Sequence, residues 1–286
     1  MNRSWLFVPA DRPDRMAKAW ASGADAIILD LEDSVAPSRK DEARRQASAF
    51  LKAPPAATGP EIWVRVNPLA SGVTERDLDS IMPGGPSGIV LPKPDHAGDA
   101  AALARLLEAR EEKGRRGGTR ILPIATETPR AVFALGSYAD TANPRVIGLT
   151  WGAEDLPAAV GAQVNRAPDG QYTDLCRIAR ALCLAGAAAA DIPAIETVYP
   201  DFKDMDGLAA YARQGRQEGF AGMLAIHPAQ VAPINRVFSP TADEIARARR
   251  IVGLFDADPD AGVIALDGRM LDRPHLIQAR RLLSGR

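Results

Sequence analysis

Short apolar runs of strand length recur along the chain, and each is followed by a polar residue and then by a stretch rich in Ala, Leu and Arg. Several runs are apolar almost throughout, such as AIILDL and GIVLPK, which is typical of strands buried on both faces of a parallel sheet. The pattern predicts eight strands, at residues 5–9, 26–31, 62–67, 88–92, 121–125, 146–150, 193–198 and 222–226.

Helical stretches separate the predicted strands, at residues 15–22, 40–51, 100–113, 130–138, 173–190 and 205–218, with another at 241–255 after the last strand. Eight strands alternating with helices favour a (β/α)8 TIM barrel over an open doubly wound sheet. We therefore predict a catalytic barrel over residues 1–240 and a C-terminal helical extension over residues 241–286. The extension has no ninth strand to supply, so we expect it to pack outside the barrel or against a neighbouring subunit.

Composition narrows the class of protein. The chain has 286 residues, which suits one barrel with an extension. Its 35 Lys and Arg residues balance 36 Asp and Glu residues, so charge gives no general argument for a nucleic-acid or membrane partner. The N-terminal apolar run covers only residues 5–8, too short for a signal-peptide core or a membrane span. We expect a soluble, cytoplasmic protein.

The two cysteines, Cys176 and Cys183, lie seven residues apart in a predicted helix. Side chains two helical turns apart are too distant to form a disulfide or to ligate one metal ion. We interpret both as small apolar core residues.

Charged and hydrogen-bonding side chains follow nearly every predicted strand at its carboxyl end, where the function of a barrel is placed. These residues are Asp30, Glu32 and Asp33 after the second strand, Arg65 and Asn67 in the third, Lys93 after the fourth, Glu127 after the fifth, Glu154 and Asp155 after the sixth, Tyr199 and Asp201 after the seventh, and His227 after the eighth. Acidic residues in such positions also serve as helix N-caps, and this alternative stays open for Asp33 and Asp155. Lys93 can equally be a solvated loop residue, and His227 a structural one.

The acidic strand ends fit a magnesium site. Mg²⁺ prefers oxygen ligands, keeps several waters, and is commonly held by one or two carboxylates together with the substrate. Glu127 and Asp155 match that requirement, and Glu32 and Asp33 are placed to orient the waters. Zinc is disfavoured because His96, His227, His275 and the cysteines make no ligand-spaced set; the histidine positions are far apart in sequence.

Arg65 lies inside the apolar run WVRVN, and a buried guanidinium needs an anionic partner. Next to a metal site it would face an anionic, metal-chelated substrate. Such a pair is suited to stabilising an enolate or alkoxide oxygen.

Eight sequence blocks resemble the HpcH/HpaI aldolase family, in its citrate lyase β-subunit-like branch, whose relatives include malyl-CoA and citramalyl-CoA lyases. In order along the chain they are RSWLFVPADRPDRMAKA, GADAIILDLEDSVAPSRKDEAR, WVRVNP, GIVLPKP, ATETPRAV, WGAEDL, AIHPAQV and DGRMLDRP. One departure is Thr126, which stands before Glu127 where relatives usually carry an apolar residue.

The resemblance implies a metal-dependent TIM barrel that makes or breaks a carbon–carbon bond next to a thioester. It places the Mg²⁺ ligands on Glu127 and Asp155, the substrate-binding role on Arg65 and Glu127, and a catalytic role on Arg65. The acids of the DLED block, which fall on Asp30, Glu32 and Asp33, would lie near the waters of the metal.

The resemblance also implies a shared site. An aspartate of the C-terminal motif, here Asp272, would reach a neighbouring subunit's site as the catalytic acid or base. Relatives with this tail are commonly homotrimers or dimers of trimers.

The predicted reaction is a reversible Claisen-type cleavage of a 3-hydroxyacyl-CoA, such as malyl-CoA or citramalyl-CoA, to an acyl-CoA and a 2-oxo acid. The phosphates of CoA need cations, and Arg12, Arg15, Lys40 and Arg44 are candidates near the first two units.

Three alternatives remain open from the sequence. The chain could act as a citrate lyase β subunit on a citryl group bound to an acyl carrier protein. It could be a pyruvate-type class II aldolase that does not use CoA. It could also be a non-catalytic assembly or regulatory protein on a barrel scaffold, which would not need Arg65, Glu127 and Asp155 together.

Overall fold

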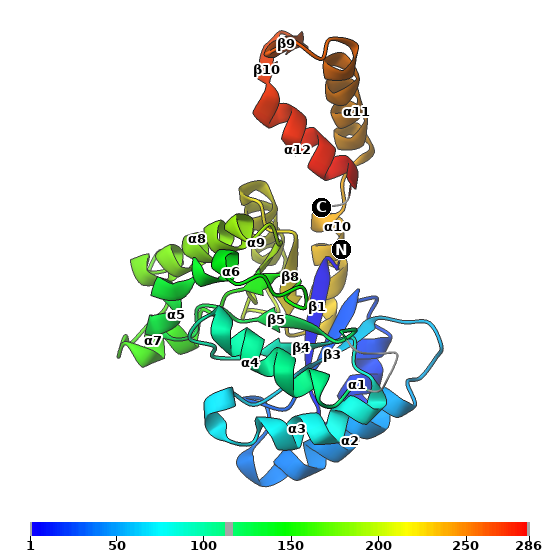
Figure 1. The fold of residues 1–286 in the computed structure, drawn as a ribbon, viewed down its shortest axis with the longest axis vertical. Helices are drawn as coiled ribbons and strands as arrows, with labels where there is room; N and C mark the ends of the chain where they lie inside the picture. The colour runs from blue at the N-terminus through cyan, green and yellow to red at the C-terminus, as the bar shows by residue number, and fades with distance from the viewer. Residues whose placement is uncertain (1, 112–116, 285–286) are drawn as a thin grey trace.

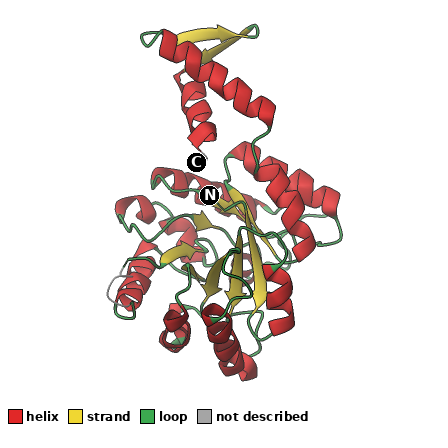
Figure 2. Ribbon diagram, turned by 90° about the vertical axis from the view of Figure 1, so that its right-hand side faces the viewer, coloured by secondary structure: helices red, strands yellow, loops and turns green. Residues whose placement is uncertain are grey.

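Eight parallel strands form one sheet that curls into a barrel surrounded by helices (Figures 1 and 2). The computed structural model describes residues 2–111 and 117–284. The strands are β1 (Ser4–Pro9), β2 (Ala26–Asp30), β3 (Glu61–Arg65), β4 (Gly88–Leu91), β5 (Arg120–Pro123), β6 (Leu149–Thr150), β7 (Ala194–Glu196) and β8 (Gly222–Ala225).

The strand order is β5-β4-β3-β2-β1-β8-β7-β6, so β5 and β6 are the two edges. Parallel bridges from Ile121 to Val146 and from Ile124 to Thr150 join these edges. The amide of Ala125 also donates a 2.7 Å hydrogen bond to the carbonyl of Thr150. The predicted TIM-barrel fold is confirmed.

Helices follow the strands and cover the outside of the barrel (Figure 2). They are α1 (Pro13–Trp20), α2 (Lys40–Lys52), α3 (Thr74–Ile81), α4 (Ala97–Glu108), α5 (Pro129–Ala134), α6 (Ser137–Asp140), α7 (Asp155–Ala159), α8 (Asp174–Ala189), α9 (Met205–Glu218) and α10 (Val231–Phe238). The predicted helix at 130–138 is two short helices, α5 and α6. The last two residues of the helix predicted at 100–113 lie outside the described residues.

The core is divided by the alternation of side chains along each strand. On β2, Ile28 packs inside the barrel with Trp5 and Trp63, while Ile27 and Leu29 pack outward against the helices. The rings of Trp5 and Trp63 meet edge to face, with centroids 5.0 Å apart. Gly88 makes room for them, because a Cβ there would lie 2.2 Å from the Trp63 ring.

The C-terminal segment forms an arm that projects away from the barrel (Figure 1). It consists of α11 (Ala242–Ala257), the antiparallel strands β9 (Val263–Leu266) and β10 (Arg269–Asp272), and α12 (Arg273–Ser284). We refer to residues 242–284 as the arm. Its own small core contains Ala248, Ile251, Phe255, Leu266, Leu271, Leu276 and Ala279. The tail supplies no strand to the barrel, as expected, but the hairpin β9–β10 was not anticipated.

Cys176 and Cys183 are free thiols buried in α8, which confirms their interpretation as core residues. No helix in the described part of the chain is long and apolar enough to cross a membrane.

Candidate active site at the carboxyl ends of the strands

Arg65, the last residue of β3, is held by two acids of the DLED block. Its Nε and Nη2 atoms donate 2.7 Å hydrogen bonds to the two carboxylate oxygens of Asp30, the last residue of β2. Its Nη1 atom lies 2.8 Å from Oε2 of Glu32. The guanidinium also lies over the ring of Phe7, 4.9 Å from its centroid. The anionic partner that a buried arginine requires is therefore present.

Asp30 is fixed from several sides. Besides Arg65, it accepts hydrogen bonds from the backbone amides of Glu32 at 2.9 Å and Ser34 at 3.1 Å. Burial alone would raise the pKa of Asp30, but Arg65 and these hydrogen bonds outweigh it and leave the pKa below its ordinary value. Asp30 is thus an ionised support that holds the Arg65 fork in one orientation.

Lys93 connects four acidic side chains, although the sequence left its role open. Its ammonium group bonds Glu32, lies 2.9 Å from Asp33 Oδ2, and lies 3.1 Å from Asp155 Oδ1. Its backbone amide donates a 2.6 Å hydrogen bond to Glu127 Oε2. Lys93 adopts a φ of 51°, a left-handed conformation that is uncommon for a residue with a side chain and is often found at functional sites.

Glu127 and Asp155 come together because the ends of β5 and β6 are joined. The hydroxyl of Thr126, a fully buried residue, accepts a 3.1 Å hydrogen bond from the amide of Gly152. A Cβ on Gly152 would lie 2.8 Å from Cγ of Glu127, so only glycine allows this approach. Thr126 therefore joins the segment that carries Glu127 to the segment that leads to Asp155.

The Glu127 carboxyl is buried, and its ionised form is disfavoured. Burial and the negative charge of nearby Asp155 raise the pKa of Glu127 to about 8, against the opposing effect of Lys93 and Arg65. Burial also raises the pKa of Glu32, although Arg65 and Lys93 oppose it. A divalent cation between Glu127 and Asp155 would relieve this repulsion.

The donor set suits magnesium better than a softer metal. Within residues 2–111 and 117–284, no group of three or more His, Cys, Asp and Glu side chains is arranged to hold an ion by itself. A site of two carboxylates completed by waters and substrate is the arrangement that Mg²⁺ commonly uses. The residues present thus fit Mg²⁺.

The four basic residues considered for CoA phosphates differ in availability. Arg44 is buried and bonds Asp77 at 2.7 Å and Asp41 at 2.6 Å. Lys40 donates 2.6 Å hydrogen bonds to the carbonyls of Leu31 and Glu32. At the rim where β1 ends, Arg12 caps α1, is half-buried and has its Nε 3.6 Å from Asp14 Oδ1, whereas Arg15 in the first turn of α1 is exposed.

Asp272 does not join the other predicted residues. It ends β10 in the arm, where its carboxylate lies 2.5 Å from Nδ1 of His275 and is 43% exposed. Figure 1 shows the arm directed away from the barrel of its own chain. Asp272 would therefore have to act on the site of another copy.

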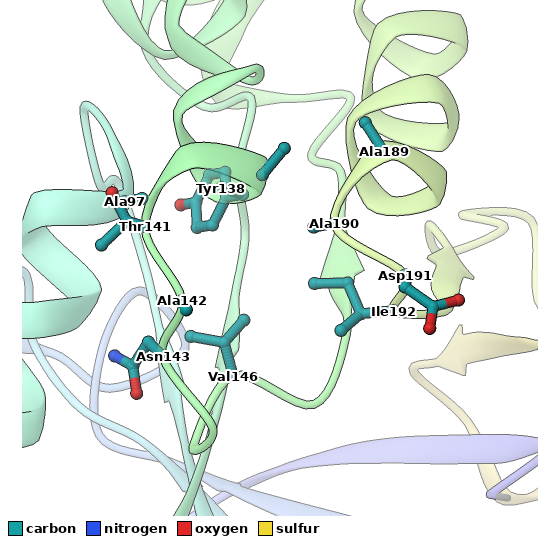
Figure 3. Close-up of a pocket in the computed structure, with 11 residues that line it drawn as sticks. Ala97, Tyr138, Thr141, Ala142, Asn143, Val146, Ala189, Ala190, Asp191 and Ile192 are labelled. Carbon is teal, nitrogen blue, oxygen red and sulfur yellow. The ribbon is translucent and has the colours of Figure 1, made fainter.

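A hollow of about 200 Å³ lies between α6, the end of α8 and the segments that lead into β6 and β7 (Figure 3). It is lined by Tyr138 and Thr141 near α6, by Val146 before β6, and by Asp191 and Ile192 before β7. None of the predicted site residues lines it.

Comparison with known proteins points to one family. A family model described as HpcH/HpaI aldolase/citrate lyase matches residues 3–228. The "Citrate lyase subunit beta-like protein" of Mycobacterium tuberculosis is 35% identical over 280 residues, which are 98% of this chain and 93% of that protein. A "(3S)-malyl-CoA thioesterase" of Cereibacter sphaeroides is 33% identical over 284 residues, covering 99% of this chain and 93% of that protein.

A solved structure shares nearly the whole architecture. The CitE protein of Mycobacterium tuberculosis, in complex with magnesium, acetoacetate and coenzyme A, aligns with a TM-score of 0.79 and 32% identity. The alignment covers 99% of this chain and 97% of that one.

Proposed function

Because the chain belongs to the HpcH/HpaI aldolase/citrate lyase family and is an enzyme of the lyase class, we propose that it is a Mg²⁺-dependent lyase acting on a 3-hydroxyacyl-CoA. The reaction would be the reversible Claisen-type cleavage to an acyl-CoA and a 2-oxo acid. The observation that carries the proposal is the meeting of Glu127 and Asp155 beside the anchored Arg65.

Glu127 and Asp155 would hold the ion. When bound, Mg²⁺ would supply Lewis-acid chemistry, lowering the pKa of a substrate hydroxyl that it contacts. Glu32 and Asp33, held by Lys93, would accept hydrogen bonds from waters on the ion. The magnesium in the related CitE structure supports this assignment.

Arg65 would bind the substrate carboxylate and the oxygen on which negative charge develops. A guanidinium carries five N–H groups. In the described chain three of them point at Asp30 and Glu32, so two remain for substrate oxygens. Because both acids fix the plane of the fork, Arg65 is preorganised and does not have to reorient during the reaction.

Asp272 from a second copy would exchange the proton at the enolate carbon. The arm offers a surface for such a contact: Val263, Met270 and Ile277 are 54%, 72% and 52% exposed. Large exposed apolar side chains on a small unit mark interaction sites. We propose a homotrimer or a dimer of trimers in which the arm covers a neighbour's rim.

The acyl group would be carried by CoA, with Arg12 and Arg15 as phosphate contacts, since Lys40 and Arg44 are engaged within the chain. The related CitE structure contains coenzyme A, which supports a CoA thioester. A group tethered to an acyl carrier protein remains an alternative, as does an aldolase reaction without CoA. We place the protein in the cytoplasm, in keeping with its two free thiols.

Thioester hydrolysis is a second candidate function, favoured by the 33% identical relative named as a malyl-CoA thioesterase. It would begin at the same site with the same metal pair. The two reactions differ in products, because hydrolysis releases free CoA thiol and a dicarboxylic acid, whereas cleavage releases a 2-oxo acid.

A product assay separates these candidates. The protein is incubated with malyl-CoA, citramalyl-CoA and related 3-hydroxyacyl-CoA thioesters, with Mg²⁺ or with EDTA. The proposal expects Mg²⁺-dependent release of a 2-oxo acid without free thiol. Free thiol in place of the 2-oxo acid would assign the thioesterase reaction. Mg²⁺-dependent release of pyruvate from a free 4-hydroxy-2-oxo acid in a parallel incubation, with no turnover of the thioesters, would assign the aldolase without CoA.

A further inference from the structure

Glu196, the last residue of β7, is a fully buried carboxylate outside the group of residues described so far. Its neighbours on the strand show which way it points. Ile195 packs in the barrel interior and Ala194 packs in the outer layer. Because side chains alternate along a strand, Glu196 faces outward, beneath α8 and α9.

Five N–H or O–H contacts converge on this carboxylate. Oε1 accepts hydrogen bonds from the indole Nε1 of Trp151 at 2.6 Å, from the hydroxyl of Tyr211 at 2.7 Å and from the amide of Thr197 at 2.9 Å. Oε2 accepts from Nε of Arg180 at 2.9 Å and lies 2.7 Å from its Nη2. A buried charge is stable only when its lone pairs are satisfied in this manner.

The residues that pack around Glu196 leave space for its side chain. Gly215 on α9 leaves space, because a Cβ there would lie 3.0 Å from Glu196 Oε2. The ring of Tyr211 is followed by those of Tyr172 and Trp151 in an edge-to-face chain, with centroid separations of 6.0 Å and 5.1 Å. Glu196 thereby fastens β7, α8 and α9 to the segment that follows β6.

That segment leads directly to the metal pair. Trp151 is fully buried; the next residue, Gly152, bonds Thr126 and packs against Glu127. Asp155 follows at the start of α7. Residues 151–155 are thus fastened at one end by Glu196 and at Gly152 by Thr126.

We propose that Glu196 is a positioning residue that acts through the Trp151 indole N–H to set the place of Asp155 relative to Glu127. This inference rests on the proposed metal pair. Some side chains orient a metal ligand without touching the metal. Removing such a side chain typically weakens metal affinity 10- to 100-fold.

Two matched variants test the proposal. W151F removes the indole N–H, and Y211F removes the other side-chain donor to the same oxygen of Glu196; both keep an aromatic ring. Only W151F cuts the link to residues 151–155. We measure thermal unfolding, hydrogen–deuterium exchange of the amides of residues 151–156, and Mg²⁺ binding by calorimetry in the full-length protein.

The expected result is a comparable loss of stability in both variants, with faster exchange in residues 151–156 and a roughly tenfold weaker Mg²⁺ affinity in W151F alone. Unchanged exchange in W151F, or an equal loss of Mg²⁺ affinity in Y211F, would overturn the proposal. If the wild-type protein bound no Mg²⁺, the metal assignment would fail, and the exchange comparison would still decide whether Glu196 positions the segment.

Discussion

At the scale of single residues, the site is a balance of buried charges. Arg65 directs three N–H groups at Asp30 and Glu32. The ammonium group of Lys93 forms ion pairs with Glu32, Asp33 and Asp155. Glu127 accepts one hydrogen bond, from a backbone amide, and burial together with the charge of Asp155 raises its pKa to about 8. The acid with the least compensation is the one best placed to gain from a bound cation.

Lys93 competes with the metal in this arrangement, because its ammonium lies 3.1 Å from a carboxylate oxygen of Asp155. K93M should bind Mg²⁺ about tenfold more tightly, which corresponds to about 1.4 kcal/mol. It should also be less stable without metal, since Asp33 and Asp155 lose their counter-ion and Glu32 keeps only Arg65. Calorimetry and thermal unfolding measure the two effects.

K93R is the matched control, because it keeps the positive charge and the backbone amide that bonds Glu127. Its Mg²⁺ affinity should stay close to that of the wild type. Weaker Mg²⁺ binding in K93M would mean that Lys93 orients Asp155 for the metal and does not compete with it.

The sequence predicted Glu127, Asp155 and Arg65 as one cluster because strand ends meet at one rim. It did not resolve the role of Lys93, since the left-handed backbone of a lysine between two prolines leaves no pattern. The role of Glu196 was also missed, because an acid at the end of a short strand has the same sequence context whether it faces the barrel or the helices.

At the scale of elements, the eight strands were predictable because nearly continuous apolar runs mark strands buried on both faces. The shortest elements were not. Helix α7 has only five residues. Helix α10 contains Pro233 in its first turn, where a backbone N–H has no partner within the helix, so the proline is tolerated there although it suggests a loop in the sequence.

The arm hairpin did have a signal, the Asp267-Gly268 pair between two apolar runs. Both residues adopt positive φ angles, 51° and 73°, as a two-residue hairpin turn requires. The runs VIAL and RMLD are short and are exposed on one side, so the tail resembled a helical extension with an irregular loop.

A buried ion pair between Glu111 and Arg145 joins the segment that follows α4 to the segment that precedes β6. Glu111 accepts two hydrogen bonds from Arg145, at 2.7 Å and 2.8 Å, and others from the amides of Gly117 and Thr119. Its side chain is 2% exposed. Although burial opposes ionisation, Arg145 and the two amides lower the pKa of Glu111 to about 2.

E111Q should therefore lower the free energy of unfolding at pH 7 by about 3 kcal/mol. The folded-state pKa is below the ordinary 4.5, so this stabilisation is complete above that pH and is lost as the pH falls towards 2. Denaturant unfolding should show the gap between E111Q and wild type closing over that range. E108Q, at the exposed last residue of α4, should stay within about 0.5 kcal/mol of wild type. A gap that does not change with pH would contradict this role of Glu111.

At the scale of the whole molecule, the arm and the rim are two parts of one proposed site that do not meet within a chain. Co-expression of two inactive variants in one oligomer therefore tests whether the site is shared between chains. Chains carrying D272N and chains carrying E127A should each be inactive, and co-expressed mixtures should regain activity, because some sites then combine an intact rim with an intact arm. No recovery in oligomers shown to contain both chains would contradict a contribution from the neighbouring arm.

The central claim is that Glu127 and Asp155 hold the catalytic Mg²⁺. Calorimetric titration of Mg²⁺ into E127A and D155A, alongside the turnover assay, tests it most directly. E154A is the control, because Glu154 is adjacent but exposed and bonded to Asn165. We expect both alanine variants to remain folded and to lose Mg²⁺ binding and Mg²⁺-dependent turnover, while E154A retains both. Full Mg²⁺-dependent activity in either E127A or D155A would contradict the assignment.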